Sequence, residues 1–310
     1  MKNMIKKIPL PIAGVMLALA ATGNLIQTYS QGLRLVFGAV SALAGILLVI
    51  KFVMYPKDIL EDLKNPVMAS VAPTFSMACM LLAAYVKPYL ASLGLILWFF
   101  GFILHCLLII LFTIRFILKF DMKKVFPSYF IVYVGPAAAS ITAPAFNMQS
   151  LGQVVFWISF ICYLALLAIV SYRVIKVKGI PEPAQPLIII FAAPASLCLA
   201  GYLTSFDTKS MAIVGFLTAL SAVMYIFALI QLPKLLKLKF YPSYSAFTFP
   251  MVISAIAMKM TDGFLTKTGN NIAFLKYVVI IQTIIAVVLV LYVLLRYIMM
   301  LTNTKQTSKA

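Results

Sequence analysis

Ten apolar runs, each about as long as a helix that crosses a lipid bilayer, follow one another along this chain. Apolar residues make up 64% of the 310 positions and charged residues only 10%, which leaves too little polar surface for an ordinary soluble domain. Because charged and turn-forming residues separate the runs, we predict an all-α integral membrane protein with a single transmembrane domain over residues 1–310. The predicted spans lie near 8–26, 33–54, 66–86, 89–114, 127–146, 151–172, 185–204, 211–232, 243–260 and 274–300.

The basic residues are concentrated in alternate loops. Of the 25 Lys and Arg residues, 19 fall in one set of loops, which includes both ends of the chain, and six fall in the other set. This imbalance follows the positive-inside rule and predicts a multi-pass protein of the cell membrane with both termini cytoplasmic. Because these residues are spread along the chain, the net charge of +18 indicates topology and not nucleic-acid binding. The first 20 residues show no convincing cleavage site and are expected to be a retained span.

A proline recurs inside every odd-numbered run, at intervals of 62, 63, 58 and 56 residues, and no even-numbered run has an equivalent mid-helix proline. The five prolines are Pro11, Pro73, Pro136, Pro194 and Pro250. This repetition predicts five helix hairpins in a quasi-fivefold arrangement. The proline-kinked odd helices are expected inside, around a central pore, and the even helices outside.

Proline removes a backbone donor and frees the carbonyl four residues earlier, which a membrane protein tolerates where that carbonyl faces protein or a watery cavity. Five such prolines favour a shared pore, and the alternative is that they only shape helix packing. The candidate pore-lining and kink residues are Leu10, Pro11, Gly14, Ala72, Pro73, Gly135, Pro136, Ala193, Pro194 and Pro250.

Phe249 is the one bulky aromatic residue among the five positions that directly precede these prolines. If the five positions surround one axis, the Phe249 side chain is best able to close the path. Gly14, one turn after Pro11, would then offer it space. The alternative is that Phe249 faces lipid or a neighbouring helix, because helix phase is uncertain around a kink.

The apolar runs lack the groups that catalysis or tight anion binding needs. All seven acidic residues lie in loops or at run borders, and the four arginines lie toward run ends, so no carboxylate relay or arginine clamp is expected. His105, the single histidine, has no evident acid or serine partner and is expected to donate an interhelical hydrogen bond. The four cysteines lack metal-ligand spacing, and no nucleotide-binding or hydrolase motif is present. We predict no enzymatic activity, no cofactor and no metal site.

Three proline-containing pieces carry a family resemblance: Pro127-Ser128-Tyr129, Ala143-Pro144-Ala145-Phe146 and the Ser-Ala-Phe-Thr-Phe-Pro stretch at 245–250. With the five hairpins, they resemble the tellurite-resistance/dicarboxylate transporter family, which includes bacterial TehA proteins and the slow-type anion channels of plant guard cells. The resemblance implies a homotrimer in which each protomer has its own pore, blocked near mid-membrane by a phenylalanine of the ninth span. That role falls on Phe249, with Phe247 as the alternative, and Gly14 matches the small first-helix residue that faces the gate.

Two functional hypotheses stay open. The first is a passive channel for small monovalent anions such as chloride or nitrate. Broken helices direct positive dipole ends at a pore, and basic residues at the inner mouth attract anions. The second is a secondary transporter of organic dicarboxylates or of toxic oxyanions such as tellurite. The expected partners are small anions, the lipid bilayer and two further copies of the chain.

Overall fold

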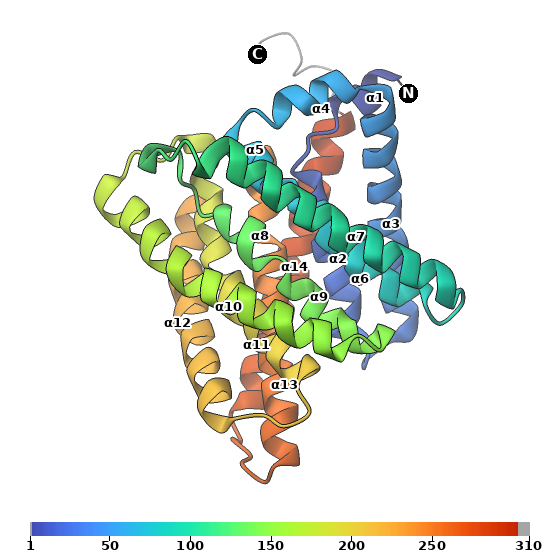
Figure 1. Cartoon of the computed structure of the whole chain (residues 1–310), viewed down its shortest axis with the longest axis vertical. Coiled ribbons are helices and arrows are strands. Elements are labelled where there is room, and N and C mark those ends of the chain that lie inside the picture. Colours follow the sequence, from blue (N-terminus) through green and yellow to red (C-terminus); the bar gives the residue numbers. More distant parts are fainter. Residues whose placement is uncertain (1, 303–310) are drawn as a thin grey trace.

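The computed structural model describes residues 2–302, and these residues form helices and connecting turns without a β-strand (Figure 1). Lys305 and Lys309, which the topology prediction counts at the inner face, lie outside the described residues. Seven helical segments of the described chain are long and apolar enough to cross a membrane. They span 31–54, 66–86, 91–117, 149–177, 182–205, 211–235 and 275–302. The protein is therefore a multi-pass integral membrane protein, as its sequence predicts.

Three of the ten predicted spans are absent from those seven, and each has a physical reason. The helix α2 (Ile12–Ile26) is only 15 residues long. Residues 129–146 are divided into α8 (Tyr129–Val134), α9 (Ala137–Thr142) and η3 (Ala143–Phe146). The helix α13 (Phe249–Lys267) carries Lys259, Asp262 and Lys267 in its second half. The arrangement of ten helices in five hairpins therefore stays a prediction.

Burial separates an inner set of segments from an outer set. The outer helices are α3 (Gln31–Met54), α7 (Ala91–Phe112), α10 (Gln149–Tyr172), α12 (Met211–Leu235) and α14 (Leu275–Thr302). In their apolar stretches only 22–33% of the residues are buried, whereas the proportion is 83% for residues 66–86 and 89% for residues 182–205. Every residue of α2 except Asn24 is also buried. The segments with the recurring prolines thus form the interior, and the five outer helices present apolar side chains to lipid.

The recurring prolines begin helices instead of kinking continuous ones. Pro11 and Pro136 directly precede α2 and α9, Pro73 is the first residue of α6 (Pro73–Val86), and Pro194 and Pro250 are the second residues of α11 (Ala193–Ser205) and α13. The first turn of a helix leaves its N–H groups without partners in that helix, so a proline there costs the new helix no hydrogen bond. The preceding pieces are α5 (Pro66–Val71), α8 and the 3₁₀ segments η5 (Glu182–Ala192) and η6 (Pro242–Phe247).

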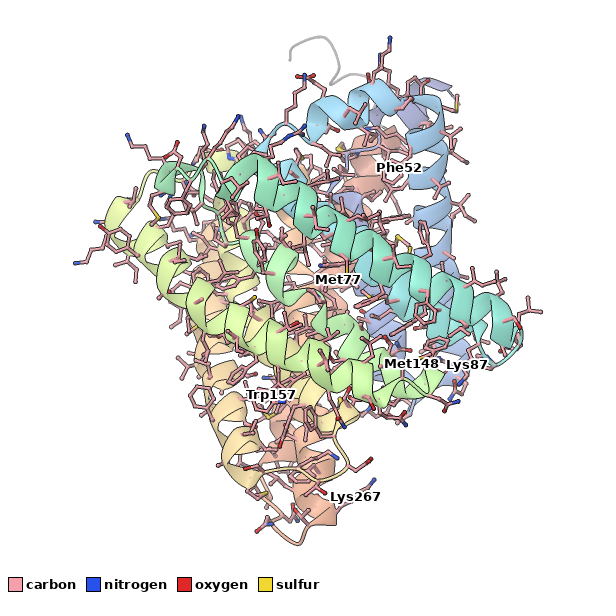
Figure 2. All side chains as sticks on the ribbon, viewed as in Figure 1. Phe52, Met77, Lys87, Met148, Trp157 and Lys267 are labelled. Atoms are coloured by element: carbon pink, nitrogen blue, oxygen red, sulfur yellow. The ribbon has the colours of Figure 1, made fainter. Side chains whose placement is uncertain are left out.

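Short helical pieces complete the chain: α1 (Lys2–Lys7), α4 (Pro56–Asp62), η1 (Thr113–Ile117), η2 (Met122–Lys124) and η4 (Arg173–Val177). Several basic side chains near these connections donate hydrogen bonds to main-chain carbonyls of neighbouring segments. Lys51 donates to the carbonyl of Ile8, and Lys87, labelled in Figure 2, donates to that of Ala145. Cations suit such positions because the C-terminal ends of helices carry partial negative charge. Part of the basic excess therefore stabilises the fold and is not free to attract anions.

Candidate functional site

A cavity of about 40 Å³, here called the central cavity, lies where the five proline segments meet. Each segment contributes to its wall, with Gly14 after Pro11, Met77 after Pro73, and Gly135 before Pro136. Met77 lies deep in the middle of the bundle (Figure 2). One water needs about 10–15 Å³ of such space, so the central cavity holds a few waters at most and is too small for a hydrated anion.

The structure brings six of the predicted site residues to this wall, namely Gly14, Gly135, Ala193, Pro194, Phe249 and Pro250. The other six predicted residues are buried but do not line the central cavity, namely Leu10, Pro11, Ala72, Pro73, Pro136 and the alternative gate residue Phe247. The prolines thus act mainly by ending one segment and starting the next. Residues that follow the prolines in the new helices, such as Gly14 and Thr74, also line the central cavity.

The two candidate gate residues lie in different surroundings. Phe249 is the first residue of α13 and lines the central cavity, and the residue is 8% exposed. Phe247 is fully buried, and its ring centroid lies 4.6 Å from that of Tyr244, away from the cavity wall. Gly14 lies on the same wall as Phe249, but its closest neighbour is Ser245. A Cβ atom at Gly14 would lie 3.1 Å from the Cβ atom of Ser245.

A wider cavity of about 320 Å³, here called the vestibule, adjoins the central cavity. Val71 and Leu187 line both cavities, so the two are contiguous. Pro11, Asn65 and Tyr241 also line the vestibule, which places it on the side of the basic loops. Among the described residues, no charged side chain lines either cavity. The two cavities therefore offer no fixed charge that would hold an ion tightly.

The helices that begin around the central cavity direct their positive dipole ends toward it. First-turn N–H groups in three of these helices already have partners, since Gly14 donates to the carbonyl of Pro11 at 2.9 Å, Ala138 to that of Gly135 at 2.9 Å and Met251 to that of Thr248 at 3.1 Å. The helix ends therefore contribute a favourable field for anions, without a ring of free donors that would replace a hydration shell.

His105 supplies a contact that the sequence did not reveal in full. Its Nε2 atom lies 3.1 Å from the carbonyl oxygen of Val132, and its Nδ1 atom lies 2.9 Å from the hydroxyl of Ser76. Since a carbonyl only accepts, Nε2 carries the proton and Nδ1 accepts from Ser76. The expected interhelical hydrogen bond is confirmed, but the expectation that His105 has no serine partner is wrong. Ser76 is 29 residues away in sequence, so only the packing of α6 against α7 brings the two together.

Comparison with known proteins identifies the family. The family SLAC1, described as voltage-dependent anion channel, matches residues 7–298. The chain belongs to the SLAC1 family. This confirms the resemblance to TehA proteins and plant slow-type anion channels. The uncharacterized transporter MJ0762 of Methanocaldococcus jannaschii is 29% identical over 236 residues, which cover 66% of this chain and 67% of that relative. The protein is thus an anion channel or transporter of a family that consists of channels and transporters, not enzymes.

Proposed function

We propose that the protein is a channel for small monovalent anions such as chloride and nitrate, with a pore in each protomer that Phe249 closes. The observation that carries the proposal is the convergence of all five proline segments on one narrow, uncharged cavity that Phe249 lines. Helix dipoles around this cavity favour anions over cations, and the uncharged wall lets an anion leave as readily as it enters. Weak, non-specific attraction of this kind suits a channel.

A secondary transporter of organic dicarboxylates or of tellurite is the alternative. Tight recognition of a doubly charged anion needs fixed cationic side chains, typically arginine in a bidentate geometry. The described walls of the central cavity and the vestibule carry none. The four arginines lie toward the ends of the apolar runs, and Arg115 and Arg173 donate to main-chain carbonyls. The channel is therefore the better-supported function.

The proposed channel crosses the cell membrane ten times, with both termini in the cytoplasm. The start of α1 and the end of α14 lie at the same end of the molecule, as an even number of crossings requires (Figure 1). The seven long helices alone make an odd number, and the three shorter segments 12–26, 129–146 and 249–267 complete ten. Assembly as a homotrimer follows from the family resemblance and is the expected oligomeric state.

Recordings from the purified protein in planar bilayers test the proposal. We expect unitary currents whose reversal potential in a chloride gradient lies toward the chloride equilibrium value and moves little when potassium is replaced by a bulky cation. Because the path offers no ligands in place of water, nitrate, which loses its hydration more easily, should be more permeant than chloride. Saturable, proton-dependent flux without unitary currents would instead support the transporter.

A further inference from the structure

Two lysines and two glutamines meet in a pocket at the ends of α10 and α12, outside the proposed path. The pocket has a volume of about 340 Å³, and Lys178, Gln185, Gln231 and Lys234 line it; we call it the basic pocket. It shares no lining residue with the central cavity or the vestibule, so it serves a purpose separate from the proposed conduction. Both α10 and α12 lie on the outside of the bundle, where lipid surrounds them (Figure 1).

The cations of the basic pocket have no acidic partner in the described part of the chain. The three salt bridges there join Lys6 to Asp58, Lys64 to Glu61 and Lys124 to Asp121. Glu182, the acidic residue nearest in sequence to Gln185, accepts a hydrogen bond from the hydroxyl of Tyr241 at 2.7 Å and does not line the pocket. The two positive charges therefore face a potential ligand without a competing carboxylate.

The backbone at Lys178 is held in a conformation that side chains rarely adopt. Lys178 has φ 55° and ψ −161°, in a region used almost only by glycine, and Gly179 follows with φ 69°. Such a backbone conformation is strained in a residue other than glycine and persists only where its surroundings hold it. Here the guanidinium of Arg173, which is 2% exposed, donates to the carbonyl of Lys178 and, at 3.2 Å, to that of Lys123. Arg173 thereby fixes the turn that places Lys178 at the pocket.

The remaining wall is apolar, with Val174, Ile180, Ile188 and Leu235. Beside it, Ile175 and Ile230 are 62% and 69% exposed on the faces that lipid covers. A ligand that fits has an anionic head for the lysines and the glutamine amides and an apolar body that lies along α10 and α12. We propose that the basic pocket binds the phosphate group of an anionic glycerophospholipid. Lysine ammonium groups are suited to phosphate, and basic pockets between helices at the membrane surface take up lipid head groups.

Thermal unfolding of the full-length protein in neutral detergent, titrated with phosphatidylglycerol, tests this site. We expect a saturable rise in the unfolding midpoint that phosphatidylcholine does not produce. Lys178→Gln and Lys234→Gln should each raise the half-saturating phosphatidylglycerol concentration about fivefold. This factor corresponds to the loss of one lysine contact with an anionic lipid. Lys237→Gln is the matched control, because it removes the same charge one turn from Lys234 but outside the pocket.

A second variant separates binding from folding. Lys178→Gly relieves the backbone strain and removes the ammonium group, so it should raise the midpoint without lipid and still need about five times more phosphatidylglycerol for half-saturation, as Lys178→Gln does. Equal weakening by Lys234→Gln and Lys237→Gln would overturn the proposal, since it would show only diffuse attraction to a negative surface. Inorganic phosphate that matches the effect of phosphatidylglycerol at equal concentration would also overturn it, because the apolar wall would then contribute nothing.

Discussion

The Nε2 atom of His105 lies 3.1 Å from the carbonyl oxygen of Val132, the carbonyl that Pro136 leaves without its helical donor. His105 on the outer helix α7 thus supplies the hydrogen-bond donor that this inner segment lacks where its helix is interrupted. His105 and Val132 are both fully buried, so no water substitutes for the imidazole. This contact ties the outer layer of the bundle to the wall of the proposed pore.

Replacement of His105 by leucine should destabilise the protein because the Val132 carbonyl then stays unpaired. We expect a loss of about 1–3 kcal/mol in the free energy of unfolding, the cost of an unsatisfied buried acceptor. Denaturant unfolding in detergent, followed by circular dichroism, measures this loss. His105→Gln keeps a donor and should recover part of it. A His105→Leu protein as stable as the parent would show that the bond contributes nothing.

Gly135 leaves no room for a larger residue. A Cβ atom there would lie 2.6 Å from Cε1 of His105 and 2.9 Å from Sδ of Met77, both closer than real contacts allow. Gly135→Ala should therefore lower stability by about 1–3 kcal/mol through overpacking. Gly215→Ala on α12 is the control, because a Cβ atom there meets nothing within 4 Å, and alanine favours a helix over glycine. The unfolding midpoint should fall for Gly135→Ala and rise for Gly215→Ala. Shifts of the same sign in both variants would contradict the close packing around Gly135.

The sequence predicts which segments belong to the inner and outer layers, because each recurring proline limits the backbone conformation of its own segment whatever packs against it. Phe249, which the sequence singles out by its position before Pro250, lies at a helix start and lines the central cavity, and its role as a gate stays a prediction. The sequence does not predict which side of an apolar helix faces which neighbour. The helix α7 is apolar all round, so its rotation, and with it the pairing of His105 with Ser76, depends on packing.

The roles of individual basic residues are also not predicted by the sequence. Their distribution predicts topology, but their individual roles depend on contacts between residues far apart in the chain. Lys51 and Lys259 count as loop charges in the sequence, whereas in the structure they donate to the carbonyls of Ile8 and Leu25 in the first span. The strained turn at Lys178 has no sequence signal beyond the glycine that follows it. Partners that lie so far apart in sequence can be identified only from the three-dimensional structure.

The proposed topology predicts which positions a membrane-impermeant thiol reagent reaches in intact cells. Cysteine introduced at Lys267 or Gln149 should react from outside, and cysteine at Lys123 or Lys237 only after permeabilisation. Lys267 lies at the end of the molecule opposite to α1, which supports opposite accessibility (Figure 2). The four native cysteines should be replaced first, since Cys106 and Cys162 are only half-buried. Reaction at Lys237 in intact cells would overturn the arrangement of ten spans.

Phe249→Ala should open the proposed pore. The phenyl ring lines a cavity of about 40 Å³, and its removal widens and wets a constriction that otherwise excludes ions by dewetting. We expect a marked rise in anion conductance in planar bilayers, with the reversal potential unchanged, because the helix dipoles that set selectivity are not altered. Loss of a buried ring costs stability, typically about 3–5 kcal/mol, so currents must be normalised to folded protein.

Phe247→Ala is the matched control because it deletes the same ring two residues away, where the side chain packs on Tyr244 and does not line the central cavity. It should lower stability at least as much as Phe249→Ala, since Phe247 is fully buried, but leave conductance near that of the parent. If Phe247→Ala opens the pore and Phe249→Ala does not, the gate lies on the other face of this segment. If neither variant changes the conductance of folded protein, the closure is made by the aliphatic wall of Leu17, Val134 and Leu197, and the proposed role of Phe249 is wrong.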